Sequence, residues 1–265
     1  MKLRVAIRVA AALALAAGLG GCATLGSMSD IEVWTLGDEA LYRGEHKAAI
    51  AYYDELLRRN PENAAVLARR GLAHDRTGNE AQAREDYTAA IARAPQAPLP
   101  YLYRANLALR GGQAEAALAD VAALDALPLD PHDRAAALVL GGAAWAQRGE
   151  FARAVAAYER AIELGRRDPS PLLRKHYQDA LYNAAHAYYH LGAFDRAAAA
   201  YRELLRSKAQ HRQPVTPQDH YALGVLLYLS GDFAGARQHL AQAPAERRAK
   251  AAEALGDPGF FAAAR

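Results

Sequence analysis

Residues 71–95 read GLAHDRTGNEAQAREDYTAAIARAP, and this stretch decides the fold. Its apolar residues recur at helical spacing on both sides of Gly78, which suits the left-handed end of one helix and the turn into the next. Gly71 lies seven residues before Gly78, Ala83 five after it and Tyr87 nine after it. Small residues at Gly71 and Ala83 let two helix backbones approach closely, while Tyr87 fills the space beside the crossing. The stretch therefore predicts a helical hairpin.

The same pattern recurs along most of the chain. It is centred on six glycines spaced 34, 34, 37, 43 and 39 residues apart: Gly44, Gly78, Gly112, Gly149, Gly192 and Gly231. The residues five positions after them are all alanine: Ala49, Ala83, Ala117, Ala154, Ala197 and Ala236. One hairpin cannot bury both of its faces, so neighbouring hairpins must stack. Composition agrees, since 66 residues are Ala while Val, Ile and Thr together supply 19, which favours helix over strand.

Hairpins of about 34 residues with this pattern resemble the tetratricopeptide repeat (TPR) family, and the resemblance covers roughly residues 30–250. It implies an all-α fold, an α-solenoid of about six helical hairpins. The third and sixth units depart from the pattern, with Val121 and Leu240 where the others have Tyr. The longer spacings predict insertions around residues 127–133, 165–175 and 207–216.

The last part of the chain predicts two further helices. Thr216-Pro217-Gln218-Asp219 has a capping residue, a Pro in the first helical position and an acid three residues after the cap, so a helix should begin at Pro217. Residues 244–255 predict a polar capping helix, followed by a short tail with Phe260 and Phe261. We therefore assign residues 30–265 to the solenoid, with its capping helix from residue 244.

Residues 1–21 have the layout of a secretory signal, with Lys2, Arg4 and Arg8 before an apolar run that is too short to span a bilayer. They end in Leu19-Gly20-Gly21, directly before Cys22, the single Cys of the chain. This sequence resembles the lipobox of bacterial lipoproteins, which implies that residues 1–21 are a lipoprotein signal peptide and that Cys22 carries diacylglycerol and an acyl chain such as palmitate. Residues 22–29 are then a tether of at most about 25 Å. Because Ala23 rather than Asp follows the Cys, the resemblance implies the periplasmic face of a Gram-negative outer membrane.

Charge excludes one class of partner. The chain has 32 Lys and Arg against 29 Asp and Glu, but three of the basic residues lie in the predicted leader, so the mature chain is neutral. A neutral chain has no electrostatic footprint for a phosphate backbone, and no nucleic acid partner is expected.

The first helix of each hairpin lines the concave side in TPR proteins, so the resemblance indicates which residues face a partner. In the fifth unit, Tyr182, His186, Tyr189 and His190 share one helix face, while Ala180 and its neighbours occupy the other. Tyrosine provides large contact area with a hydrogen-bonding end, as peptide-binding surfaces require. The alternative is that these rings pack between helices. The predicted partner-binding groove comprises Trp34, Tyr42, Asn106, Tyr182, His186, Tyr189, His190, Tyr221 and Tyr228.

Signals for chemistry are weak. His186 and His190 are four residues apart and could share one metal ion, but no Glu follows His186 as in zinc proteases. No serine has a hydrolase setting, and no phosphate-binding loop is found. We expect no enzyme activity, no cofactor, no bound metal and no small-molecule substrate.

The sequence thus predicts a lipid-anchored TPR scaffold that binds a periplasmic or outer-membrane protein or peptide segment. The resemblance favours an assembly factor for an envelope complex such as a type IV pilus or its secretin. An adaptor for peptidoglycan hydrolases is the first alternative. A metal-binding protein or enzyme using His186 and His190 is the second, from a different class.

Overall fold

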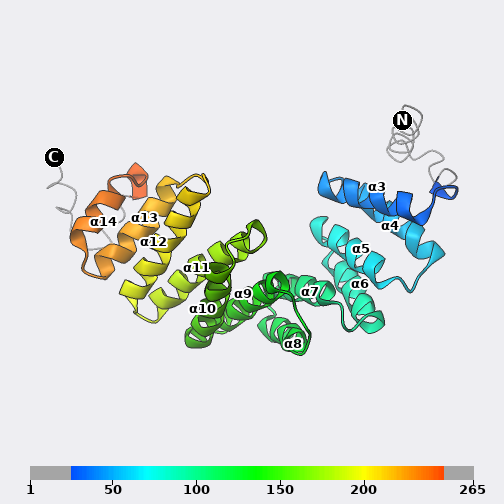
Figure 1. Cartoon of the computed structure of the whole chain (residues 1–265), viewed down its shortest axis with the longest axis horizontal. Helices are drawn as coiled ribbons and strands as arrows, with labels where there is room; N and C mark the ends of the chain where they lie inside the picture. The colour runs from blue at the N-terminus through cyan, green and yellow to red at the C-terminus, as the bar shows by residue number, and fades with distance from the viewer. Residues whose placement is uncertain (1–24, 248–265) are drawn as a thin grey trace. The chain divides into compact units, whose positions relative to one another are not determined.

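The computed structural model describes residues 25–247, and within this range the chain is helical and contains no strand. The chain divides into two compact units, Met1–Leu127 and Pro128–Arg265. Unit 1 contains α3 (Asp30–Tyr42), α4 (His46–Arg59), α5 (Ala64–Arg76), α6 (Glu80–Arg93), α7 (Pro98–Arg110) and α8 (Ala114–Asp125) (Figure 1). Unit 2 contains α9 (Pro131–Gln147), α10 (Phe151–Arg167), α11 (Pro171–His190), α12 (Phe194–Gln210), α13 (Pro217–Leu229) and α14 (Phe233–Leu240) (Figure 1). The predicted signal peptide and Cys22 lie outside the described residues.

Successive helices pair as hairpins, which confirms the repeat predicted from the sequence. All six repeat glycines adopt left-handed φ values, between 71° and 86°. At Gly78 the turn is closed by the amide of Asn79, which donates to the carbonyl of His74 at 2.9 Å. A residue with a Cβ is strained in this conformation, so glycine allows the chain to reverse directly after the first helix.

Within a hairpin, the two helices interlock where a small residue of the first faces a large one of the second. A Cβ atom added to Gly71 would lie 2.7 Å from Cε1 of Tyr87, and one added to Gly142 would lie 2.5 Å from Cε1 of Tyr158. Both tyrosines are buried, and the six repeat alanines have no exposed surface. Because the glycine of the first helix has no side chain, the tyrosine ring of the second helix can pack directly against its backbone.

The longer spacings of the later repeats are accommodated mainly by longer helices. α10 and α12 have 17 residues each and α11 has 20, compared with 14 in α4 and α6. The insertions predicted around residues 165–175 and 207–216 therefore lie partly in helices, which end at Arg167 and Gln210.

The predicted start of α13 at Pro217 is confirmed. The amide of Asp219 donates to Oγ1 of Thr216 at 3.2 Å, and the Thr216 amide donates to Oδ2 of Asp219 at 2.8 Å. This reciprocal pair satisfies amide groups that a helix start leaves without partners.

Residues 245–247 are helical, and the rest of the predicted capping helix and the Phe260-Phe261 tail lie outside the described residues. Among the described helices, none combines the length and apolar character needed to cross a membrane.

Candidate partner-binding groove

A cavity of about 510 Å³ lies between α11 and α13 of unit 2. We call it the aromatic groove, because α11 contributes Tyr182, His186 and Tyr189 to its lining and α13 contributes Tyr221. Arg247 also lines the groove. The structure thus brings four of the sequence-predicted residues together in one cavity.

The spacing along α11 explains why these side chains face the groove. Tyr182, His186 and Tyr189 recur every three or four residues, so they lie on one side of the helix. On the other side Ala180 and Ala184 are fully buried in the core of unit 2. Because the alanines account for the packed face, Tyr182 and Tyr189 remain 55% and 44% exposed.

The groove has a polar floor that the sequence analysis did not identify. Asp219 accepts a hydrogen bond from the hydroxyl of Tyr201 at 3.2 Å and from Nζ of Lys208 at 2.8 Å. The ring of Tyr182 lies 6.2 Å from that of Tyr201. Tyr201 occupies the tyrosine position of the fifth repeat and Asp219 caps the start of α13, and each residue also forms part of the groove surface.

The groove offers aromatic surface, hydrogen-bonding groups and one cation. Burial lowers the pKa of His186, and the neighbouring His190 lowers it further, so the His186 imidazole is neutral at pH 7. The guanidinium of Arg247 lies 5.3 Å from the ring centre of Tyr221. A neutral imidazole and tyrosine hydroxyls can donate or accept hydrogen bonds, as recognition of a peptide backbone requires.

Two further predicted residues of unit 2 lie beside this cavity rather than in its lining. The ring of His190 stacks on Phe151 with centroids 4.3 Å apart. Tyr228 is near the end of α13, and its ring meets that of Phe233 edge-on at 5.2 Å. Each ring therefore packs against an aromatic residue that begins another helix, Phe151 of α10 for His190 and Phe233 of α14 for Tyr228.

The three predicted residues of unit 1 do not share a single cavity. Trp34 is partly buried, with its ring edge-on to Tyr53 at 6.3 Å. Tyr42 is 94% exposed and lines a separate cavity of about 550 Å³ with Asp38, Arg69 and Arg76. Asn106 is exposed on α7 and lines neither this cavity nor the aromatic groove.

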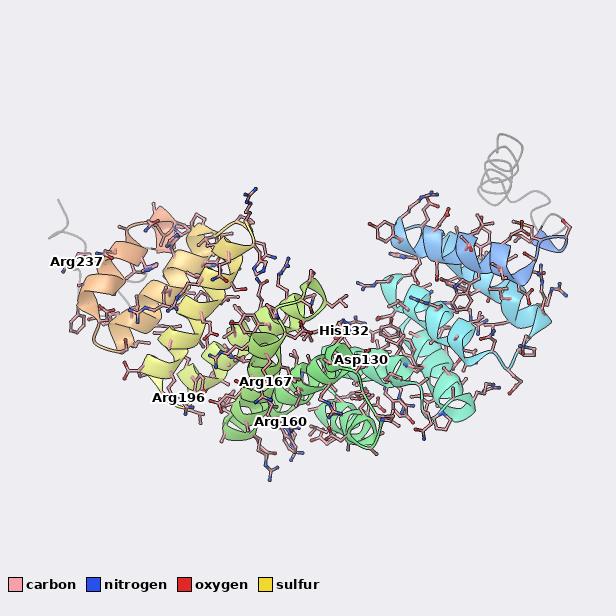
Figure 2. The ribbon with its side chains drawn as sticks, in the orientation of Figure 1. Asp130, His132, Arg160, Arg167, Arg196 and Arg237 are labelled. Atoms are coloured by element: carbon pink, nitrogen blue, oxygen red, sulfur yellow. The ribbon has the colours of Figure 1, made fainter. Side chains whose placement is uncertain are left out.

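A third cavity, of about 340 Å³, lies between α10 and α12 and is lined by paired charges. Arg196, labelled in Figure 2, donates to Glu159 at 2.7 Å, and Arg166 donates to Glu203 at 2.7 Å. The hydroxyl of Tyr188 also donates to Glu159. Both ion pairs join α10 to α12 and remain partly exposed to water, so each contributes little to stability.

Comparison with family models identifies the repeat. A model described as tetratricopeptide repeat matches residues 35–98, 102–171, 170–212 and 182–254. Among curated proteins, sequence comparison finds no match.

Solved structures resemble the chain in fold at low sequence identity. PilW, described as a widely conserved type IV pilus biogenesis factor, is 17% identical, with a TM-score of 0.68 over 80% of this chain and 91% of PilW. PilF of Pseudomonas aeruginosa is 16% identical, with a TM-score of 0.67 over 80% of this chain and 89% of PilF. The MamA protein is 20% identical, with a TM-score of 0.55 over 71% of this chain and 98% of MamA.

Proposed function

Because the chain belongs to the tetratricopeptide repeat family, we propose that it is a scaffold without enzyme activity that binds a segment of a protein partner in the aromatic groove. The observation that carries this proposal is a cavity of about 510 Å³ with two half-exposed tyrosines on one wall. Contact between exposed aromatic surface and water is unfavourable in free energy, so a partner that covers this surface stabilises the complex. The floor formed by Tyr201 and Asp219 is held by hydrogen bonds, so the groove is ordered before a partner binds.

We further propose that Cys22 carries the lipid anchor and that the scaffold works at the periplasmic face of the outer membrane. The leader-like residues 1–21 and the single Cys support this proposal. Anchoring concentrates a bound partner at the membrane, so the function of the scaffold is localisation.

Assembly of a type IV pilus or its secretin is the role we favour. It is supported by the fold shared with PilW, whose description names type IV pilus biogenesis, over most of both chains. An adaptor for peptidoglycan hydrolases needs the same groove and anchor.

The test is a crosslinking capture from membranes of cells that express the protein, compared with a Cys22→Ala form. We expect the wild-type protein to capture pilus or secretin components. The Cys22→Ala protein should be absent from the membrane fraction and should not capture them. Capture of cell-wall hydrolases would favour the adaptor instead. A Cys22→Ala protein that stays in the outer membrane and captures the same partners would contradict the anchor.

A further inference from the structure

Seven of the nine histidines lie in unit 2, and six of these form three close pairs. Nε2 of His132 and Nε2 of His176 are 3.3 Å apart, although the residues are 44 positions apart in the chain. Nε2 of His186 and Nε2 of His190 are also 3.3 Å apart. The third pair differs, with Nδ1 of His220 and Nδ1 of His239 3.0 Å apart.

In two of the pairs, the separation of the nitrogen atoms suits a shared metal ion as well as a hydrogen bond. Two imidazoles on one tetrahedral Zn²⁺, with bonds of about 2.0–2.1 Å, have their ligating nitrogens about 3.3–3.4 Å apart. The His132–His176 and His186–His190 pairs meet this distance without movement. The shorter separation in the third pair is that of an ordinary N–H···N hydrogen bond.

Neighbouring carboxylates distinguish the His132–His176 pair from the His186–His190 pair. Asp130, His132 and Asp133 have possible ligand atoms within 4.8 Å of one another, and this is the group of three such residues found in the described part of the chain. Figure 2 shows Asp130 and His132 close together near the start of α9. The other pair instead has an aromatic surrounding, because His190 stacks on Phe151.

Asp133 also orients the His132 ring so that Nε2 can bind a metal ion. Oδ1 of Asp133 lies 3.3 Å from Nδ1 of His132, and a proton on Nδ1 leaves the lone pair of Nε2 free to face His176. His132 keeps 44% of its side chain exposed, which gives an ion access and lets water complete its coordination.

We propose that His132 and His176 bind a divalent transition metal ion of the zinc class, with Asp133 orienting His132 and water completing the coordination. The ion would join the start of α9 to the first half of α11, two helices already in contact. Its role is to fix successive hairpins of unit 2 relative to each other, independently of whether a partner occupies the aromatic groove.

The test uses the full chain without a polyhistidine tag, stripped with chelator and titrated with ZnCl₂ by calorimetry. We expect one Zn²⁺ per chain and a rise in melting temperature on binding. Asp133→Asn should weaken binding by about 10- to 100-fold, as loss of an orienting carboxylate does, and His176→Ala should weaken it more. The matched control is His190→Ala, which removes one ring of the other pair and should leave the affinity unchanged.

Circular dichroism must show that each variant keeps the helicity of the wild-type protein. Loss of binding in His190→Ala but not in His176→Ala would overturn the assignment, because the ion would then sit on α11 alone. A folded wild-type protein that binds no Zn²⁺ at stoichiometric concentrations would also overturn it.

Discussion

At the scale of single residues, each hairpin depends on a small residue that faces a large one across the helix crossing. Gly71 touches the Tyr87 ring, and Gly224 faces the side chain of Leu240 in the same way. This contact could be predicted from the sequence because both partners lie within one repeat, at fixed distances from the same glycine turn. The Leu240 example explains why the sixth repeat tolerates the loss of its tyrosine: the side chain still fills the space that the glycine leaves.

Gly71→Ala should destabilise the protein by about 1–3 kcal/mol, the cost of overpacking a close-packed core. The new Cβ would lie 2.7 Å from Cε1 of Tyr87 and 3.1 Å from Cβ of Asp86, so the two helices must separate. This cost opposes the gain of about 1 kcal/mol in helix propensity. Urea unfolding followed by circular dichroism measures the difference.

Gly111→Ala is the matched control, because its Cβ would meet nothing closer than 3.6 Å and its φ of −82° suits any residue. It should leave the free energy of unfolding unchanged or slightly raised. Equal stability of the two variants would show that the helix crossing is looser than the structure indicates.

At the scale of elements, Asp219 links the start of α13 to α12 and to the groove floor. It caps α13 with Thr216, and it accepts hydrogen bonds from Lys208 and Tyr201 of α12. Burial raises the pKa of Asp219, but the hydrogen bonds from Lys208 and Thr216 outweigh burial and hold the pKa below its ordinary value of 3.8. The ionised carboxylate therefore stabilises unit 2.

Asp219→Asn should lower the free energy of unfolding at pH 7 by about 1–3 kcal/mol, since hydrogen bonds to a charged group are lost. A group whose pKa is depressed in the folded state contributes stability above its unfolded-state pKa and loses it as pH falls through the folded value. The deficit of the variant should thus shrink as pH falls below about 3.8, the ordinary pKa of the carboxyl.

Thermal unfolding from pH 7 to pH 2.5 or so would follow this change, a range set by the ordinary titration of carboxyl groups. Asp195→Asn, at an exposed acid in the first turn of α12, is the control and should have little effect. A deficit for Asp219→Asn that stays constant across the whole pH range would contradict the role of the charge.

The face of α11 that lines the groove could be predicted because helical spacing is local. The other wall of the groove is formed by α13, the first helix of the sixth hairpin. The sequence predicts which residues of α13 share a face, but it does not show which of their side chains approach α11. The approach of His132 to His176 left no signal at all, because it depends on how α9 and α11 pack across 44 residues of intervening chain. The opposite case is His190 and Tyr228, whose spacing suits the groove face although aromatic residues at the starts of α10 and α14 hold their rings.

At the scale of the whole molecule, charge is distributed unequally between the two units. Residues 25–127 carry 11 basic and 15 acidic side chains, a net charge of −4, while residues 128–247 carry 15 basic and 12 acidic, a net charge of +3. The neutral total of the predicted mature chain therefore conceals two units of opposite sign. Composition alone could exclude a strongly basic chain, but it could not show this separation, which depends on where the chain divides.

The central claim is that the aromatic groove holds the partner. The most direct measurement compares partner capture by the wild-type protein, by a Tyr189→Ala, Tyr221→Ala double variant and by Leu172→Ala, which removes a 71% exposed side chain of α11 outside the groove. We predict that the double variant keeps its helicity but binds at least roughly 30-fold more weakly, the loss of about 2 kcal/mol typical of an interface anchor. Leu172→Ala should bind as the wild type does. Unchanged capture by a folded double variant would contradict the claim and move the binding surface elsewhere on the molecule.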